Sequence, residues 1–138
     1  MTITSIALKE GVLKSVMQAC RNVHPDEFIG VLKGRIVEQR GPGRTVGSVV
    51  EVSELLVAPF SEYAESWSGF SEWFLPTSQD NVGTIHSHPN GVLLPSAQDK
   101  RFWSSLGVAH VIAGAPYRLN SWRAFDASGK PIQARVIK

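Results

Sequence analysis

The sequence predicts a single mixed domain, of the α+β type or a three-layered α/β type. Its 138 residues suit one domain with one core, so residues 1–138 are expected to form one unit. Hydrophobic residues make up 43% of the chain and charged residues 19%, a balance that supports a buried core and argues against disorder. The predicted helices and strands mix without the regular βα alternation of a parallel sheet.

An amphipathic helix is predicted over residues 9–23. Its apolar residues recur at helical spacing on one face: Leu8, Val12, Leu13, Val16, Met17, Cys20 and Val23. The His24-Pro25 step ends this helix, because the residue before a proline is disfavoured in the helical region.

Strands are predicted along much of the remaining chain. They cover residues 28–33 (closed by Gly34), 46–57 (as one or two strands), 82–88, 110–113, 121–126 and 131–137. Gly41-Pro42-Gly43 and Ser128-Gly129 supply turns. A second helix is predicted from Ser96 to about Leu106, and the S-x-x-D spacing from Ser96 to Asp99 is that of a capping box.

The segment from 60 to 80 is the least regular part of the chain and resembles a surface loop or flap. Its aromatic residues are Trp67, Phe70, Trp73 and Phe74. Two interpretations are equally open: these side chains belong to the core, or Trp67, Phe70 and Trp73 form a rim that binds a peptide substrate.

Charge and composition exclude several classes of function. The net charge is +2 and no Lys/Arg block is present, so no nucleic-acid partner is expected. The one cysteine, Cys20, cannot form an intrachain disulfide and suits a reducing cytoplasm. We expect no signal peptide and no membrane span, because no basic region precedes an apolar run and no run approaches about 18 apolar residues.

A candidate metal site lies in the segment His86-Ser87-His88-Pro89 and the helix start after it. Alternate side chains of a strand point the same way, so His86 and His88 are expected on one face. Asp99, in the first turn of the next helix, can fold back toward them. Two imidazoles and one carboxylate leave a fourth tetrahedral position for water, which is the arrangement of a catalytic zinc ion, one per chain.

Hydrolysis at such a site needs further groups. Zinc lowers the pKa of water from about 15.7 toward 7, and a carboxylate is still needed to move the proton. Glu27 is the candidate base, at the head of an apolar strand where burial would raise its pKa. Ser96 could donate a hydrogen bond to the developing oxyanion.

Together, Glu27, His86-Ser87-His88-Pro89, Ser96 and Asp99 resemble the motif of the JAMM metalloproteases, also called MPN-plus. The resemblance covers most of the chain and is greatest to the small stand-alone archaeal or bacterial members. It implies that His86, His88 and Asp99 bind zinc, that Glu27 is the general base and that Ser96 assists the oxyanion. It also implies a curved mixed sheet flanked by helices, related to the cytidine-deaminase fold. Residues 60–80 match the family least.

Simpler interpretations exist for individual residues. Ser96 could be only a helix cap, and Asp99 only a favourable charge at a helix N-terminus. We interpret Cys20 as a core thiol, His24 as the end of a helix and His110 as a structural residue without a partner at metal spacing.

Several functions remain open on this basis. The favoured one is an isopeptidase that acts on the extended C-terminal tail of a ubiquitin-like protein. The alternatives are trimming of a sulfur-carrier protein, hydrolysis of a small amide by the same site, and a catalytically silent MPN-type scaffold. A zinc deaminase is disfavoured, because that class usually shows H-x-E with P-C-x-x-C and this chain has one cysteine.

Overall fold

The computed structural model describes residues 2–57 and 80–138. Along these ranges the elements are β1 (Ile3–Lys9), α1 (Glu10–Val23), β2 (Ile29–Gly41), β3 (Arg44–Val57), β4 (Asn81–His88), α3 (Ala97–Trp103), β5 (Ala109–Gly114), β6 (Trp122–Asp126) and β7 (Pro131–Ile137). The segment predicted as a loop or flap lies outside the described residues, except for Asp80.

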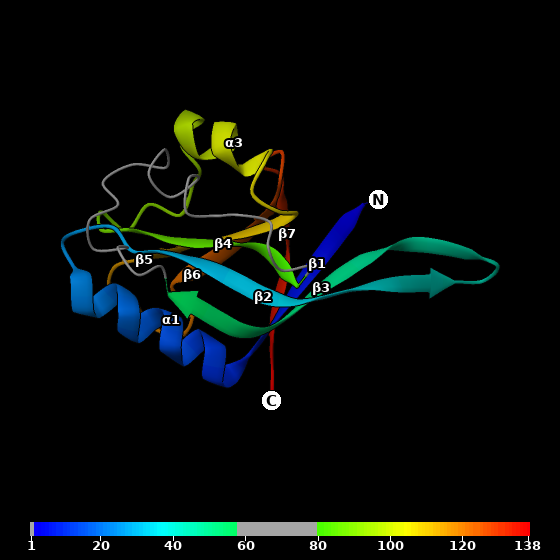
Figure 1. The fold of residues 1–138 in the computed structure, drawn as a ribbon, viewed down its shortest axis with the longest axis horizontal. Coiled ribbons are helices and arrows are strands. Elements are labelled where there is room, and N and C mark those ends of the chain that lie inside the picture. Colours follow the sequence, from blue (N-terminus) through cyan, green and yellow to red (C-terminus); the bar gives the residue numbers. More distant parts are fainter. Residues whose placement is uncertain (1, 58–79) are drawn as a thin grey trace.

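The described strands form one curved mixed sheet that closes on itself (Figure 1). Their order is β1-β3-β2-β4-β5-β6-β7, and β1 also pairs with β7. The pairs β1–β3, β1–β7 and β4–β5 are parallel, and the others are antiparallel. The mixed fold and curved sheet predicted from the sequence are therefore confirmed.

Among the described residues, α1 and α3 pack on opposite faces of the sheet (Figure 1). The larger core lies under α1 and includes Leu13, Met17 and Cys20 of that helix together with Ile85 of β4. The smaller core lies under α3 and is built around Trp103, Ile112 and Phe125. β4 lies between these two cores and is buried on both of its faces, so it can carry different chemistry on each face.

The amphipathic pattern predicts α1 correctly. Val12, Leu13, Val16, Met17 and Cys20 form its buried face, and the helix ends before His24 as expected. Leu8 is an exception: it lies buried in β1 rather than on the helix. β1 itself is missed in the sequence, since its seven residues are few and both of its partners are distant along the chain.

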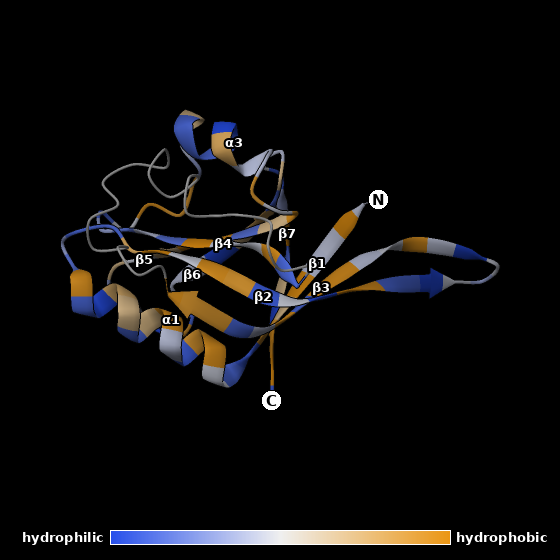
Figure 2. Cartoon of the chain, viewed as in Figure 1, coloured by the Kyte–Doolittle hydropathy of each residue, from blue (hydrophilic) through white to orange (hydrophobic). Residues whose placement is uncertain are grey.

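The prediction that the strand after Phe28 closes at Gly34 is wrong. β2 continues to Gly41 and pairs along its length with β3, which is one strand. A register shift at Lys33/Gly34 lets the strand pass through the glycine, where any Cβ would collide with the backbone of Glu51. The resulting hairpin projects from the body of the protein (Figure 1), and its far end is hydrophilic (Figure 2).

The second half of the chain follows the sequence-based prediction closely. β4, β5, β6 and β7 differ from their predicted ranges by one residue at most. The second helix is shorter than predicted and ends at Trp103 rather than near Leu106. The hydroxyls of Ser104 and Ser105 donate to the carbonyls of Arg101 and Phe102, and such local hydrogen bonds compete with continuation of a helix. Neither helix in the described ranges is long and apolar enough to cross a membrane.

Candidate metal centre

The end of β4 places two histidines on the same face of the sheet. His86 and His88 alternate with Ser87, so their side chains point toward α3 while Ser87 points toward α1. His86 is buried at 1% exposure, and its ring lies 6.0 Å from the ring of Trp103. The His88 side chain is 13% exposed, which leaves this end of the site open to a ligand.

The capping box at the start of α3 places Asp99. The Ser96 hydroxyl accepts a hydrogen bond from the Asp99 backbone N–H at 3.0 Å, and Asp99 Oδ2 accepts one from the Ser96 N–H at 2.8 Å. This reciprocal pair holds the buried carboxylate at the beginning of the helix. The predicted helix cap and the predicted ligand position are thus one local structure.

Three donor atoms converge at this point. His86 Nε2 and His88 Nε2 lie 2.9 Å apart, and Asp99 Oδ2 lies 3.2 Å from the first and 3.3 Å from the second. Zinc bonds of about 2.0–2.2 Å in a tetrahedral site separate neighbouring ligand atoms by about 3.3 Å or slightly more. The donor set His86, His88 and Asp99 therefore fits one metal ion of this size without rearrangement of the fold.

The orientation of His88 depends on a backbone carbonyl that sequence inspection did not identify. His88 Nδ1 lies 2.6 Å from the carbonyl oxygen of Val92. A neutral imidazole that donates from Nδ1 presents the lone pair of Nε2 to the metal position. The Asn90-Gly91 turn brings Val92 back toward the strand, with Gly91 at φ +80° and its N–H donating to the His88 carbonyl. The only sequence signal for this contact is that turn.

The electrostatics of the ligands favour an ionised Asp99. Burial alone would raise the pKa of Asp99, but hydrogen bonds from His86 and His88 outweigh it and hold this pKa well below its usual range. Burial disfavours the charged form of His88, but its hydrogen bonds to Asp99 and to the Val92 carbonyl raise its pKa overall. Without a metal, the cluster therefore attracts a proton in the place where a cation could bind.

Glu27 lies near these ligands because of the register between β2 and β4. Ile29 is paired with His86 in an antiparallel ladder. The position two residues before Ile29 therefore corresponds to the position two residues after His86, which sets Glu27 opposite His88. Glu27 and His88 line the same cavity of about 580 Å³. The expectation that Glu27 is buried is wrong: it precedes the first residue of β2 and is exposed at the cavity edge.

Ser96 lines the same cavity together with Glu27, His88 and Asp99. It is exposed, and its hydroxyl oxygen accepts the N–H of Asp99. A hydroxyl also carries one proton to donate, so capping leaves Ser96 able to hydrogen-bond a ligand in the cavity. The structure thus brings together the five residues predicted as ligands, base and oxyanion donor.

His110 lies behind the site and has a structural environment. It is fully buried, its Nδ1 lies 2.7 Å from Thr84 Oγ1, and its ring stacks on Trp103 at 4.7 Å. Burial, followed by the charge of His86, lowers the pKa of His110 to about 3, so it stays neutral. The expectation that His110 is no metal ligand agrees with this position.

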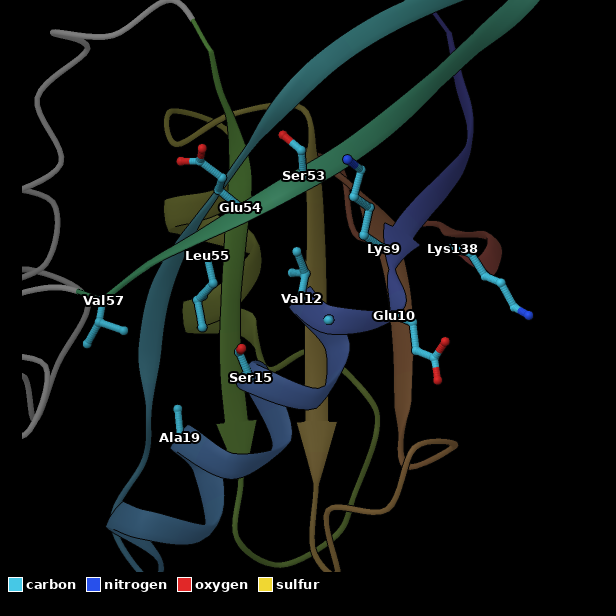
Figure 3. Close-up of a pocket in the computed structure, with 11 residues that line it drawn as sticks. Lys9, Glu10, Val12, Ser15, Ala19, Ser53, Glu54, Leu55, Val57 and Lys138 are labelled. Carbon is cyan, nitrogen blue, oxygen red and sulfur yellow. The ribbon is translucent and has the colours of Figure 1, made fainter.

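A larger cavity, of about 970 Å³, lies elsewhere. It runs between α1 and the last part of β3 and is lined by Lys9, Glu10, Glu54 and Lys138 among others (Figure 3). None of the predicted metal ligands lines it. The chemistry expected from the sequence therefore belongs to the smaller cavity. The predicted substrate residues Trp67, Phe70 and Trp73 lie outside the described residues.

Known proteins are similar to this chain over most of its length. Residues 9–125 match the model of a family described as prokaryotic homologues of the JAB domain. A protein of Haloferax volcanii described as a probable metalloprotease is 34% identical over 125 residues, which cover 91% of this chain and 75% of that protein.

Two solved structures are similar over nearly their whole length. A JAB1/MPN domain protein from Archaeoglobus fulgidus is 27% identical with a TM-score of 0.65, covering 96% of this chain and 98% of that one. A structure described as "JAMM: A Metalloprotease-like Zinc Site in the Proteasome and Signalosome" is also 27% identical. Its TM-score is 0.64, and the match covers 99% of this chain and 100% of that one.

Proposed function

We propose that this chain, which belongs to the family of prokaryotic homologues of the JAB domain, is a zinc-dependent metallopeptidase. Its membership confirms the resemblance to JAMM proteins that the motif predicts. The observation that carries the proposal is the convergence of His86 Nε2, His88 Nε2 and Asp99 Oδ2. His88 and Asp99 of this set line an open cavity. The similar Haloferax protein described as a probable metalloprotease supports the same reaction class.

The reaction that we propose is hydrolysis of an amide or isopeptide bond. His86, His88 and Asp99 would hold one zinc ion, which polarises a carbonyl group and lowers the pKa of water when bound. Glu27, at the cavity edge, takes a proton from the attacking water and returns it to the leaving nitrogen as the C–N bond breaks. Its carboxylate is then regenerated for the next cycle.

Ser96 has two roles in this proposal. Its hydroxyl oxygen keeps Asp99 in place through the capping box. Its hydroxyl proton would be donated in a hydrogen bond to the carbonyl oxygen of the substrate, on which negative charge develops. Exposure of both Ser96 and Glu27 supports these roles, because each group can reach a substrate that enters from solvent.

For the substrate, we propose the extended C-terminal tail of a ubiquitin-like or sulfur-carrier protein. The open cavity at the end of β4 suits a flexible chain better than a folded domain. A tail that ends in glycines would let the backbone approach His88 and Asp99 closely, because glycine has no Cβ. Contact of the tail with Trp67, Phe70 or Trp73 remains a prediction. No nucleic-acid or membrane partner is part of the proposal, and a reducing cytoplasm as its location rests on the single cysteine.

The test combines metal analysis with cleavage. The purified protein is assayed on a ubiquitin-like protein fused through its glycine-ending tail to a reporter, with and without a chelator. A matched fusion with a tail too short to leave the folded domain serves as control. We expect cleavage of the long-tailed fusion only, loss with chelator and recovery with zinc.

Other outcomes separate the alternatives. Cleavage of a small amide but of neither fusion would replace the protein substrate by a small molecule. A zinc-loaded protein that cleaves nothing but retains the tailed fusion on a column would indicate a silent scaffold. Capture of a cellular protein by Glu27→Gln, which should keep the metal and lose turnover, would identify the natural substrate.

A further inference from the structure

We propose that Ser87 and Tyr117 are positioning residues that hold the segment bearing Glu27 against the metal-ligand strand. They act from the face of β4 opposite the metal centre. The inference rests on the proposed function, because it takes Glu27 as the base. It goes beyond the motif, since neither residue is a ligand, a base or an oxyanion donor in that scheme.

Ser87 fixes the C-terminal end of this segment. It stands between His86 and His88 but points toward α1, where it is completely buried. The Ser87 N–H donates to the Phe28 carbonyl at 2.9 Å, and the Ser87 Oγ accepts the Phe28 N–H at 2.8 Å. One residue therefore satisfies both backbone groups of Phe28, the residue that follows Glu27.

This contact extends the sheet beyond the regular ladder. The β2–β4 pairing begins at Ile29 and His86, so Phe28 lies one step outside it. In a continued ladder, the Phe28 N–H would donate to a backbone carbonyl of β4. Here it donates to the Ser87 hydroxyl instead. Phe28 itself is buried. Its backbone is thus held in register, and Glu27 remains exposed on the His88 side.

Tyr117 fixes the other end. His24 ends α1, and its Nδ1 lies 2.8 Å from the phenol oxygen of Tyr117, 93 residues away in the chain. Tyr117 is buried and has φ +60°, a conformation that is unfavourable for a residue with a large side chain. Its N–H donates to the Gly114 carbonyl at 2.9 Å, and its carbonyl accepts from Arg21 at 2.7 Å. Surrounding contacts thus hold Tyr117 in place.

The two anchors limit the freedom of the short stretch between them. Only Pro25, Asp26 and Glu27 lie between His24 and Phe28, and all three are exposed. Without both anchors, three exposed residues would sample many backbone conformations. Displacement of a catalytic base by about 1 Å can lower the reaction rate on the order of 10²-fold. The two anchors should therefore affect turnover.

Cys20 of α1 lies close to both Ser87 and Tyr117. Burial raises the pKa of the Cys20 thiol to about 12, and a hydrogen bond with Ser87 partly opposes that shift. Burial likewise raises the pKa of Tyr117, and its hydrogen bond with Ser87 acts in the opposite direction. Neutral polar groups of α1, β4 and the turn after β5 therefore meet behind the metal ligands, in a region closed to solvent.

Amide exchange tests the anchoring without any need for activity. Hydrogen exchange of the Phe28 N–H, followed by NMR, should accelerate at least about tenfold in Ser87→Ala. It should stay near wild type in Ser87→Thr, which keeps the hydroxyl. Amides of β6 should not change in either variant. An unchanged Phe28 exchange rate in a folded Ser87→Ala protein would overturn the assignment of Ser87.

Kinetics then test whether the anchors act through Glu27. We expect Ser87→Ala and Tyr117→Phe to lower kcat about tenfold or more, with KM and zinc content unchanged and with rescue by Ser87→Thr. In a Glu27→Gln background the same substitutions should have no further effect on the residual rate. Ser105→Ala is the control. It removes an exposed hydrogen bond from the Ser105 hydroxyl to the Phe102 carbonyl at the end of α3 and should leave kcat unchanged.

The outcomes are distinguishable. An equal loss in both backgrounds means that Ser87 and Tyr117 only stabilise the fold, and the positioning role is then wrong. A parallel loss of zinc in Ser87→Ala would likewise contradict it, because the hydroxyl faces away from the metal. If the zinc-loaded wild type cleaves no substrate, the proposed function fails, while the exchange rate of Phe28 still decides whether Ser87 holds the segment.

Discussion

The two faces of β4 differ in burial and in the chemistry of their side chains. His86 and His88 face α3, where His88 lines an open cavity, whereas Ile85 and Ser87 face α1 and are completely buried. On the first face, polar groups converge around a space that suits a cation. On the second face, the Cys20 thiol stays neutral, because burial raises its pKa to about 12. Alternation along a strand thus separates reactive groups from the packing that supports them.

This difference indicates how the site is supported. The metal-ligand face of β4 must be accessible to a substrate, so it cannot be fully packed. The strand therefore has to be stabilised mainly by packing on its other face. The core under α1 is the larger of the two and includes residues from the helix and from the six strands β1 to β6. The reactive face is therefore held mainly by what lies behind it, in agreement with the general need for a supported catalytic geometry.

The largest effect should follow from removing the base on the open face. We expect Glu27→Gln to slow turnover by about 10²–10⁴-fold, because a group that moves the proton is lost while no metal ligand is changed. The rate is measured on the tailed fusion, with zinc content determined in the same preparation. A rate within about threefold of wild type would exclude Glu27 as the base.

A somewhat smaller effect is expected at Ser96. Its replacement by alanine removes the proposed oxyanion donor and should lower kcat on the order of 10²-fold. The same change removes the helix cap and should reduce the free energy of unfolding by about 1 kcal/mol. Steady-state kinetics and urea denaturation measure the two effects separately. A change confined to KM would leave Ser96 with the capping role alone.

Acid should affect the open face more than the buried one. His86 and His88 must be neutral to bind a metal, and hydrogen bonding to Asp99 raises the pKa of His88 in the metal-free cluster. Protons therefore compete with zinc as the pH falls through the histidine range near 6.5. The lowered pKa of Asp99 keeps this ligand ionised throughout that range.

Bound zinc holds the two histidines neutral well below the free-histidine pKa of about 6.5, so we expect kcat/KM and zinc occupancy to decline together on the acid side of that value. Parallel measurement of rate and bound metal between pH 4 and 8 tests this expectation. Activity that stays constant down to about pH 4 would be incompatible with two histidine ligands.

The smallest effect concerns the buried face. The folded-state pKa of Cys20, about 12, lies above the unfolded value near 8.5, so the neutral thiol stabilises the fold fully below pH 8.5. This contribution is lost progressively as the pH rises toward 12. Between pH 7.5 and 9.5, wild type should lose about 1 kcal/mol more stability than Cys20→Ala. Equal losses in urea titrations would show that Cys20 is not shielded from water.

Local patterns in the sequence predicted most of the site. Helical periodicity predicted α1, and the S-x-x-D spacing predicted both the capping box and the place of Asp99. Strand alternation put His86 and His88 on one face. These features depend on residues close in the chain, whose conformational preferences can be inferred directly.

Contacts between distant parts of the chain could not be predicted in this way. β1 depends on pairing with β3 and β7, and β2 passes through Gly34 only because a bulge accommodates it. The exposure of Glu27 follows from where β2 begins, which periodicity leaves uncertain by a few residues. The contact between His24 and Tyr117 joins residues 93 positions apart and has no local signal.

Zinc content is the most direct test of the central claim, because it compares neighbouring residues on the two faces of β4. The account predicts about one zinc per chain in wild type and in Ser87→Ala, and less than about a tenth of that in His86→Ala and His88→Ala. Elemental analysis of folded, zinc-reconstituted and desalted protein provides the measurement. Wild type without zinc, or either histidine variant with a full zinc ion, would contradict the account.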